Sequence, residues 1–454
     1  MVNFIKLGII AVTCIYLLSA LLRDERRGIA IAVFFLILMP RELFVELGGG
    51  LPCLTVYRAI IISLVLYFVF ISEFPVKGEE IPVLGILVLV LIAKGISLIL
   101  AYNFREALKD FLGFAFEIVL FYVILFKALA DKDTLFSVVK AVCYATLIMA
   151  AIGFIEYYTH FNPIDYISLR GHPRFNPENA YAVYSTLSHP IHLGTALVMG
   201  WPICLYVLDQ QHSVAKKRLI WVCLLLLYAS LYFARSRGPW LAFILAAMVL
   251  VLFRYPGIKA KALAIIVITG LVLVLRPGVY DSIRGLSAAS FNPYENEGSS
   301  VYYRFELFKK AYKEVTKSQE RLAFGYGDGA AHSMNLRDEV SYGSGRMSRF
   351  WSWDSEFALI LLQQGFVGLV LNVILYSSCL LYMMKAARCT EEIECSVVTA
   401  LLASNFVLVF MMTNVAIFAP SLHLIFWTNF ALVASLLRKN TQMNHQKNKM
   451  VSRS

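Results

Sequence analysis

The chain has 454 residues, of which 59% are hydrophobic and only 16% are charged. This balance excludes an ordinary soluble domain and indicates an integral membrane protein. The formal net charge is +11, but much of the excess lies in short loops between apolar runs and in the tail, which is typical of cytoplasmic loops and argues against a nucleic-acid partner.

A helix needs roughly 20 apolar residues to cross a bilayer, and about twelve or thirteen runs of suitable length occur. They lie near residues 4–22, 28–47, 58–75, 81–101, 110–130, 135–158, 184–208, 219–234, 239–253, 261–275, 355–384, 396–414 and 421–437. No long alternating pattern suggests a barrel. The sequence therefore predicts an all-α polytopic membrane protein with about 12–13 transmembrane helices.

Four regions follow from these runs: N-terminal helices (1–275), a large extracytoplasmic loop (276–354), C-terminal helices (355–437) and a polar cytoplasmic tail (438–454). Placing the basic loops inside leaves 48–57, 102–110, 159–183, 235–238 and 276–354 on the outer face. A loop as long as 276–354 is rarely idle, so we expect function to concentrate there.

Within the long loop, VYYRFELFKKAYKEV (301–315) predicts an amphipathic helix that suits the membrane surface. Its apolar positions at helical spacing are Phe305, Phe308, Tyr312 and Val315. The eight cysteines lie in spans or near their ends and form no CxxC or Cys/His cluster. We therefore expect no metal and no cofactor.

Arginines gather on the predicted outer face, beside two carboxylates at the start of a span. They are Arg174, Arg235, Arg237, Arg304, Arg346 and Arg349, with Asp354 and Glu356. The planar guanidinium grips phosphate oxygens at two points, so the cluster suits a pyrophosphate group. The alternative for each arginine is that it snorkels to the interface or pairs with a carboxylate.

Several motifs, in the same order, resemble those of the bacterial O-antigen ligase and polymerase family. They are S-R-G-P-W-L-A (236–242), Y-R-F-E-L-F…F-G-Y-G (303–327) and D-S-E-F…Q-Q-G-F-V-G-L (354–369), with GLPCLTVYRAI, RFNPENAY and SHPIHLG earlier in the chain. The resemblance implies a multi-pass glycosyltransferase of the bacterial inner membrane that acts on the periplasmic face. Its donor would be an undecaprenyl-pyrophosphate-linked saccharide, and membrane lipid would surround it.

Site residues follow from the same resemblance. Arg237 and Arg304 would grip the pyrophosphate, with Arg235 and Arg174 nearby. Ligases typically carry His-Asn where this chain has Asp354-Ser355-Glu356, which favours a polymerase in which a carboxylate accepts the proton of the attacking sugar hydroxyl. Candidate glycan or acceptor contacts are His332, Arg346, Arg349, Trp351, Trp353 and His189, the tryptophans being alternatively interface anchors.

The expected activity is thus an inverting, metal-independent transfer that polymerises repeat units for O-antigen or exopolysaccharide. A chain-length regulator or other polysaccharide assembly protein would be a partner. Three alternatives stay open at this stage. The chain could be a ligase that moves the glycan to a lipid A core or another acceptor, a transporter of lipid-linked glycans, or a non-catalytic assembly subunit.

Overall fold

A computed structural model describes residues 2–46, 53–73, 80–168, 181–253, 270, 296–334, 336, 340–342, 346–348, 353–389 and 392–451. The N-terminal elements are α1 (Val2–Arg23), α2 (Glu25–Leu38), β1 (Phe44–Val45), β2 (Leu54–Thr55), α3 (Val56–Phe70), α4 (Leu84–Ile99), α5 (Phe104–Phe114), the π-helix η1 (Ala115–Leu120), α6 (Phe121–Ala128), α7 (Lys132–Thr159), α8 (Ile164–Ser168), α9 (Pro190–Asp209), α10 (Val214–Phe233) and α11 (Arg237–Leu252). The later elements are α14 (Asn296–Val315), α15 (Gln319–Phe324), α16 (Ala330–Ser333), β3 (Val340–Tyr342), β4 (Arg346–Ser348), α17 (Glu356–Cys389), α18 (Glu392–Met412) and α19 (Pro420–Val451). Both strand pairs, β1·β2 and β3·β4, are antiparallel.

The protein is an all-α polytopic membrane protein, as the sequence predicted. Within the described residues, seven helices are long and apolar enough to cross a bilayer. They are Asn3–Arg23, Phe104–Ala128, Lys132–Thr159, Pro190–Asp209, Glu356–Arg388, Glu394–Met412 and Pro420–Arg438, and three shorter apolar helices are Val56–Phe70, Leu84–Ile99 and Arg237–Leu252. Helices α2 and α10 cover two further predicted runs, while the predicted span 261–275 lies almost wholly outside the described residues.

Proline explains two of the places where a helix end differs from the predicted run. The run 28–47 yields a helix that ends at Leu38, because Pro40 lacks an N–H group and disfavours helical backbone at Met39. The run 184–208 becomes helical only at Pro190. There His189 caps the helix, its Nδ1 accepting from the Ile191 N–H at 3.2 Å.

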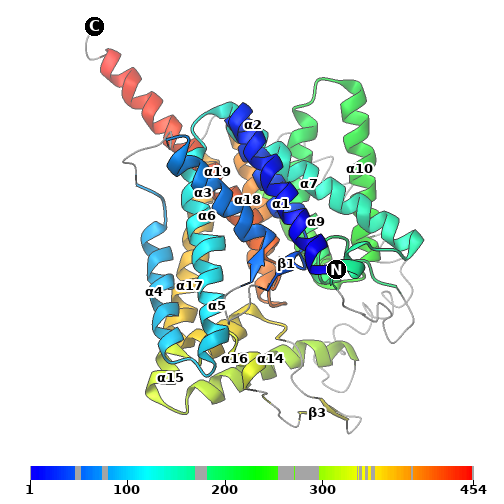
Figure 1. Cartoon of the computed structure of the whole chain (residues 1–454), viewed down its shortest axis with the longest axis vertical. Helices are drawn as coiled ribbons and strands as arrows, with labels where there is room; N and C mark the ends of the chain where they lie inside the picture. The colour runs from blue at the N-terminus through cyan, green and yellow to red at the C-terminus, as the bar shows by residue number, and fades with distance from the viewer. Residues whose placement is uncertain are drawn as a thin grey trace.

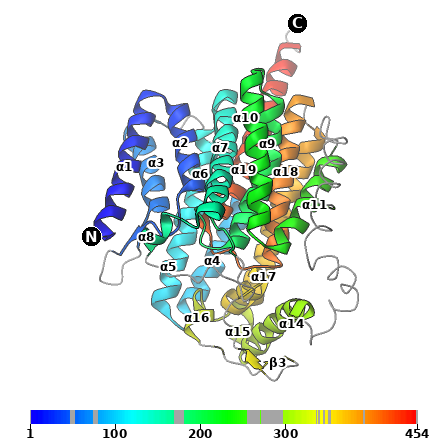
Figure 2. The same cartoon turned by 90° about the vertical axis from the view of Figure 1, so that its right-hand side faces the viewer.

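Helix α9 forms the centre of the bundle. All its residues from His192 to Leu208 are buried, and α7, α10, α11 and α18 pack around it (Figures 1 and 2). Trp201 of α9 lies 4.5 Å from Phe243 of α11, centroid to centroid. Outer helices expose large apolar side chains instead, including Leu225 and Leu252, which is the pattern expected where lipid replaces water.

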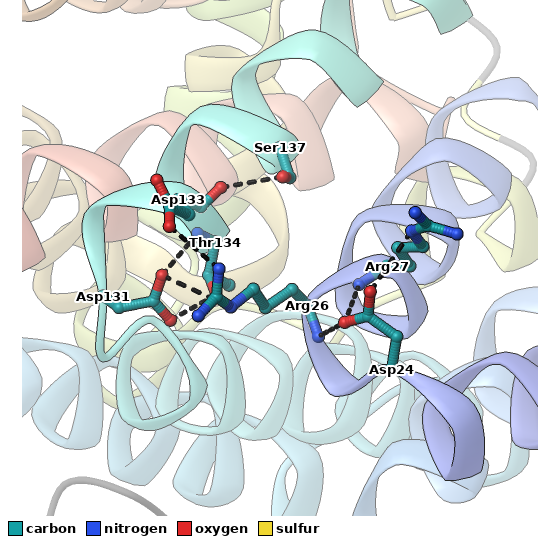
Figure 3. A network of polar contacts seen from close by, with 7 residues as sticks. All are labelled: Asp24, Arg26, Arg27, Asp131, Asp133, Thr134 and Ser137. Carbon is teal, nitrogen blue, oxygen red and sulfur yellow. Dashed lines mark hydrogen bonds and ion pairs between the residues drawn. The ribbon is translucent and has the colours of Figure 1, made fainter.

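The bundle has two chemically different ends. At the basic end, where α2, α7 and α18 begin, Arg26 pairs with Asp133 at 2.8 Å and lies near Asp131, the N-cap of α7 (Figure 3). Lys132 pairs there with Glu394 at 2.6 Å. The loop end carries α14, α15 and α16 (Figures 1 and 2). The C-terminus extends from the basic end (Figure 1).

The amphipathic helix of the long loop is present as α14, but its packed face differs from the predicted one. Leu307, Ala311 and Val315 are buried against α17, whereas Phe305 is 69% exposed and Tyr312 is 54% exposed. Lys310 and Glu314 are buried on the packed side because they form an ion pair of 3.2 Å. Phe305 and Tyr312 thus face outward, whereas Tyr303 and Phe308 pack partly against the buried cluster.

Candidate functional site

Polar side chains from three helices and from the turn after α2 converge on the 413–419 linker, the non-helical segment between α18 and α19. Its backbone pairs with Arg304 (Nε to Asn414 O, 3.1 Å), His192 (Nε2 to Ala416 O, 3.1 Å), Glu356 (Oε2 from Ile417 N, 2.8 Å) and Arg41 (Nη1 to Phe418 O, 2.8 Å). Non-helical backbone within a membrane bundle needs such internal partners. Side chains from distant parts of the sequence therefore fix the linker backbone through hydrogen bonds.

The Ser-Arg-Gly motif (236–238) lies next to the end of α18. Helix α10 ends at Phe233 and α11 begins at Arg237, so the chain reverses within three residues, with Arg235 at φ 51°. This left-handed conformation costs a non-glycine residue about 1–2 kcal/mol. A Cβ added at Gly238 would lie 3.2 Å from the Met411 Cε, two residues before the linker.

The structure thus brings Arg237 and Arg304 to the same helix end. Arg237 begins α11 next to Met411, and Arg304 of α14 donates to Asn414, three residues further along the chain. The Arg237 side chain is exposed and Arg304 is half-buried. Two arginine residues from distant parts of the sequence therefore lie at one helix end, although no single motif contains both.

Asp354 and Glu356 occupy different environments although only Ser355 separates them. Burial lowers the pKa of Arg304, and the negative charge of Asp354 acts on that pKa in the opposite direction. Ser355 caps α17, its Oγ accepting from Ala358 N at 3.4 Å. Asp354 acts on Arg304 through its charge, while Glu356 accepts a hydrogen bond from the linker backbone.

Histidines surround the aromatic residue of the linker. The Phe418 ring lies 6.4 Å from the ring of His332 in α16 and 6.5 Å from that of His192 in α9. His189, exposed at the start of α9, lies 5.7 Å from His192. Two of the predicted contact residues, His332 and His189, therefore approach the same linker as the arginines.

A backbone clamp joins the long loop to α17 and unites two of the family motifs. Helix α17 breaks at Gly365, which has φ 65°, and Gly325 has φ 68° in the facing loop. The Tyr326 N–H donates to Leu362 O at 3.0 Å, and the Gly327 N–H donates to Gln363 O at 2.8 Å. The F-G-Y-G segment thus satisfies carbonyls that the broken helix cannot satisfy itself.

A buried ion pair extends the clamp to α4. Lys94 Nζ lies 2.5 Å from Asp328 Oδ2, and both side chains are mostly buried. Gln364 donates to the other Asp328 oxygen at 3.3 Å. Ser97 donates to Gln363 O at 2.6 Å. Asp328, one residue beyond F-G-Y-G, therefore fixes the loop to the membrane-spanning helices through Lys94.

Glu314 ties α14 to this clamp and gives the loop a pH dependence. Burial alone would raise the pKa of Glu314, but hydrogen bonds from Lys317 and Lys310 outweigh it and hold that pKa below its usual value. The Glu314 carbonyl also accepts from the Tyr326 hydroxyl at 3.1 Å. The ionised form is thus stabilised in the folded state.

Because the folded pKa of Glu314 is lowered, its stabilising effect is present above the unfolded pKa and is lost as pH falls through the folded pKa. We expect the thermal unfolding temperature of the purified protein to fall less between pH 6 and pH 3 in Glu314→Gln than in the wild type. Glu306→Gln, whose ion pair with exposed Lys309 is 3.5 Å long, should follow the wild type. Equal slopes for all three proteins would contradict this assignment.

Other predicted residues are placed differently or not at all. Arg174, Arg349 and Trp351 lie outside the described residues, and Arg346 lies in β4. Trp353 is 3% exposed and packs in the apolar cluster between α14 and α17. No three described His, Cys, Asp or Glu side chains group as metal ligands, and metal independence remains a prediction.

Sequence reasoning overlooked two residues that hold the linker. Arg41 lies inside the predicted apolar run 28–47, and an ionisable residue in such a run is a candidate for a functional site. His192 belongs to the SHPIHLG motif, but nothing in the sequence gives a reason to assign it a role. Asn414 and its neighbours carried no signal, because their contribution is made by backbone atoms alone.

Residues 221–373 match a family model described as O-antigen ligase. The match runs from α10 to the first half of α17 and includes Arg237, Arg304 and the clamp. It confirms the resemblance read from the motifs and supports a membrane function in ligating or polymerising glycans, with a lipid-linked saccharide as substrate. No curated protein matches the chain.

Proposed function

We propose that the protein is a glycosyltransferase that polymerises oligosaccharide repeat units carried on undecaprenyl pyrophosphate. The observation that carries this proposal is that Arg237 begins α11 beside the end of α18 and Arg304 contacts the linker that follows it, where the charge of Asp354 acts on Arg304. The arrangement offers one guanidinium held by the linker and one exposed guanidinium for a diphosphate, together with one carboxylate for a proton. The family match covers all three residues.

In the proposed step, a hydroxyl oxygen of the acceptor sugar attacks the anomeric carbon of the donor glycan from the side opposite the pyrophosphate. The new glycosidic C–O bond forms while the bond to the pyrophosphate oxygen breaks, and the bonding electron pair leaves with the pyrophosphate. Asp354 accepts the hydroxyl proton. The configuration at the anomeric carbon is inverted.

Arg237 and Arg304 would stabilise the charge that develops on the leaving pyrophosphate. Arg304 is pre-positioned by Asn414 O, so it needs little reorganisation during the reaction. Arg237 is exposed in the first turn of α11, where backbone N–H groups also favour an anion. Glu356 is better suited to position the linker, because its carboxylate already binds Ile417 N.

The sidedness of the site follows from charge. Arg26, Lys132 and Lys216 lie at the basic end, which the positive-inside rule assigns to the cytoplasm. The loop end then faces the periplasm of a bacterial inner membrane. A lipid-linked donor in the outer leaflet would meet the site there, alongside the exposed aromatic residues of α14.

The ligase alternative keeps support from the family description, O-antigen ligase. A ligase would use the same cations but a different acceptor, and His332 and His189 lie near the linker to serve it. Asp354 at the position where ligases carry histidine favours polymerisation. Acceptor choice therefore separates the two functions, whereas donor chemistry does not.

The purified protein in detergent should lengthen an undecaprenyl-pyrophosphate-linked repeat unit without any other enzyme. Products resolved by gel should show a ladder, and Asp354→Asn should abolish it while donor binding persists. Transfer only to a lipid A core would establish the ligase alternative. Because detergent leaves no sealed compartment, an absence of product together with donor transport in vesicles would instead indicate a transporter.

A further inference from the structure

A cavity of about 580 Å³, lined by both polar and apolar side chains, lies at the basic end, far along the bundle from the arginine site. It is lined by the start of α7, the end of α9, the connection after α9 and the start of α10. Its polar lining residues include Ser137, Lys140, Tyr206, Gln210, His212 and Lys216. Its volume falls in the usual range of small-molecule sites.

The cavity has an excess of positive charge. Its lining carboxylate, Asp133, is paired with Arg26 at 2.8 Å (Figure 3). The nearby Glu394 is paired with Lys132 at 2.6 Å. Within the described part of the chain, neither Lys140 nor Lys216 forms an ion pair. An anion entering the cavity would therefore meet two cations that no carboxylate neutralises.

A buried donor in the cavity lacks a partner. Tyr206 is 2% exposed, and its hydroxyl has no hydrogen-bond partner among the described residues. A buried hydroxyl without a partner costs free energy, so the site gains when a ligand supplies an acceptor. Ser213, the N-cap of α10, also lines the cavity and makes no side-chain capping bond. These groups add donors for phosphate oxygens.

The surface next to the cavity suits an acyl chain. Tyr144 and Ile148 follow Lys140 at intervals of four residues along α7, so they share its helix face. Tyr144 is 43% exposed and Ile148 is 39% exposed. A ligand whose phosphate contacts Lys140 can therefore lay an apolar tail over these side chains. A soluble phosphate would leave them uncovered.

We propose that this cavity binds the phosphate headgroup of an anionic glycerophospholipid, with its acyl chains along α7. Lys140 and Lys216 would contact the phosphate, and the Tyr206 hydroxyl would donate to the headgroup. The site would hold the ends of α7, α9 and α10 together in the cytoplasmic leaflet. It is independent of glycan transfer, since none of its residues lies near the arginines.

Binding of short-chain phosphatidylglycerol to the purified full chain tests this inference, measured by native mass spectrometry. Two lysine contacts predict a weakening of about tenfold or more for the double variant Lys140→Gln/Lys216→Gln. Lys217→Gln/Arg218→Gln removes the same charge from α10 outside the cavity and should bind as the wild type does. Tyr206→Phe, which keeps the ring, should weaken binding by a few fold.

Equal weakening in both double variants would show diffuse surface attraction and overturn the proposal. If millimolar inorganic phosphate displaced the lipid, the site would recognise phosphate alone, and the proposal that its ligand is a phospholipid would be wrong. Unchanged thermal unfolding of the lipid-free variants would show that lost binding does not reflect misfolding. Phosphatidylcholine should bind every variant equally weakly.

Discussion

Glycan transfer by Arg304→Ala should fall by about a hundredfold or more, because a fixed donor to the leaving group typically contributes that much. Arg304 comes from the long loop and is held by Asn414 O at 3.1 Å, so its guanidinium is in place before the donor arrives. Arg304→Lys should recover only a small part of the activity, since an ammonium lacks the planar fork that holds two oxygens and the linker carbonyl together.

Arg237→Ala should show a loss of similar size, because this residue approaches the same helix end from α11. Initial rates of ladder formation at saturating donor provide the measurement. Lys313→Ala is the matched control: it removes an exposed positive charge from α14 without touching the α18 end. Near-normal rates for either arginine variant at normal membrane abundance would refute the pyrophosphate role.

The helices could be predicted because an apolar run long enough to cross a bilayer must satisfy its own backbone hydrogen bonds, whether it contacts lipid or other helices. Predicted runs in the described part of the chain coincide with helices, and the errors are local: Pro40 ends α2 early, and Pro190 delays α9. The face of α14 was harder to predict. Lys310 and Glu314 look like surface residues, yet they are buried as an ion pair that side-chain polarity alone does not reveal.

Arg237 and Arg304 could be identified from the sequence as candidate site residues, but their common position at the end of α18 could not. Charge in an apolar context identified Arg237, and the family motif identified Arg304. Arg304 is held by the 413–419 linker, and Arg237 begins α11 beside the end of α18 that precedes this linker. The linker binds its partners through backbone carbonyl and N–H groups, which do not depend on side-chain identity. Contacts made by backbone atoms cannot be read from the amino-acid composition, so the role of the linker is visible only in the folded structure.

The pairing of the two glycine motifs, F-G-Y-G and Q-Q-G, could not be predicted from the sequence for the same reason. F-G-Y-G looked like a turn in a loop, and Q-Q-G looked like part of a span. The structure pairs them, and a methyl group on either glycine would lie 2.5 Å from backbone atoms of the other segment. What the two motifs share is close backbone approach rather than catalysis.

Alanine at Gly325 or Gly365 should therefore detach the long loop from α17 and abolish transfer. Each change adds a side chain at positive φ, which costs about 1–2 kcal/mol, and also forces apart the backbones joined at Tyr326 and Gly327. Arg304 and Asp354 would then lose their fixed positions at either end of the clamped segment. Loss of activity should accompany rapid proteolysis within residues 296–334, measured in membranes.

Gly85→Ala provides the control for the clamp variants. Gly85 lies in α4, the helix that reaches the clamp through Lys94, but an added methyl group would meet no atom within 4 Å. This variant should keep both its activity and its resistance to protease. If Gly325→Ala and Gly365→Ala retain a protected loop and full transfer, the backbone pairing is not what positions Arg304. Loss of transfer with a protected loop would also refute the clamp, because the defect would then lie elsewhere.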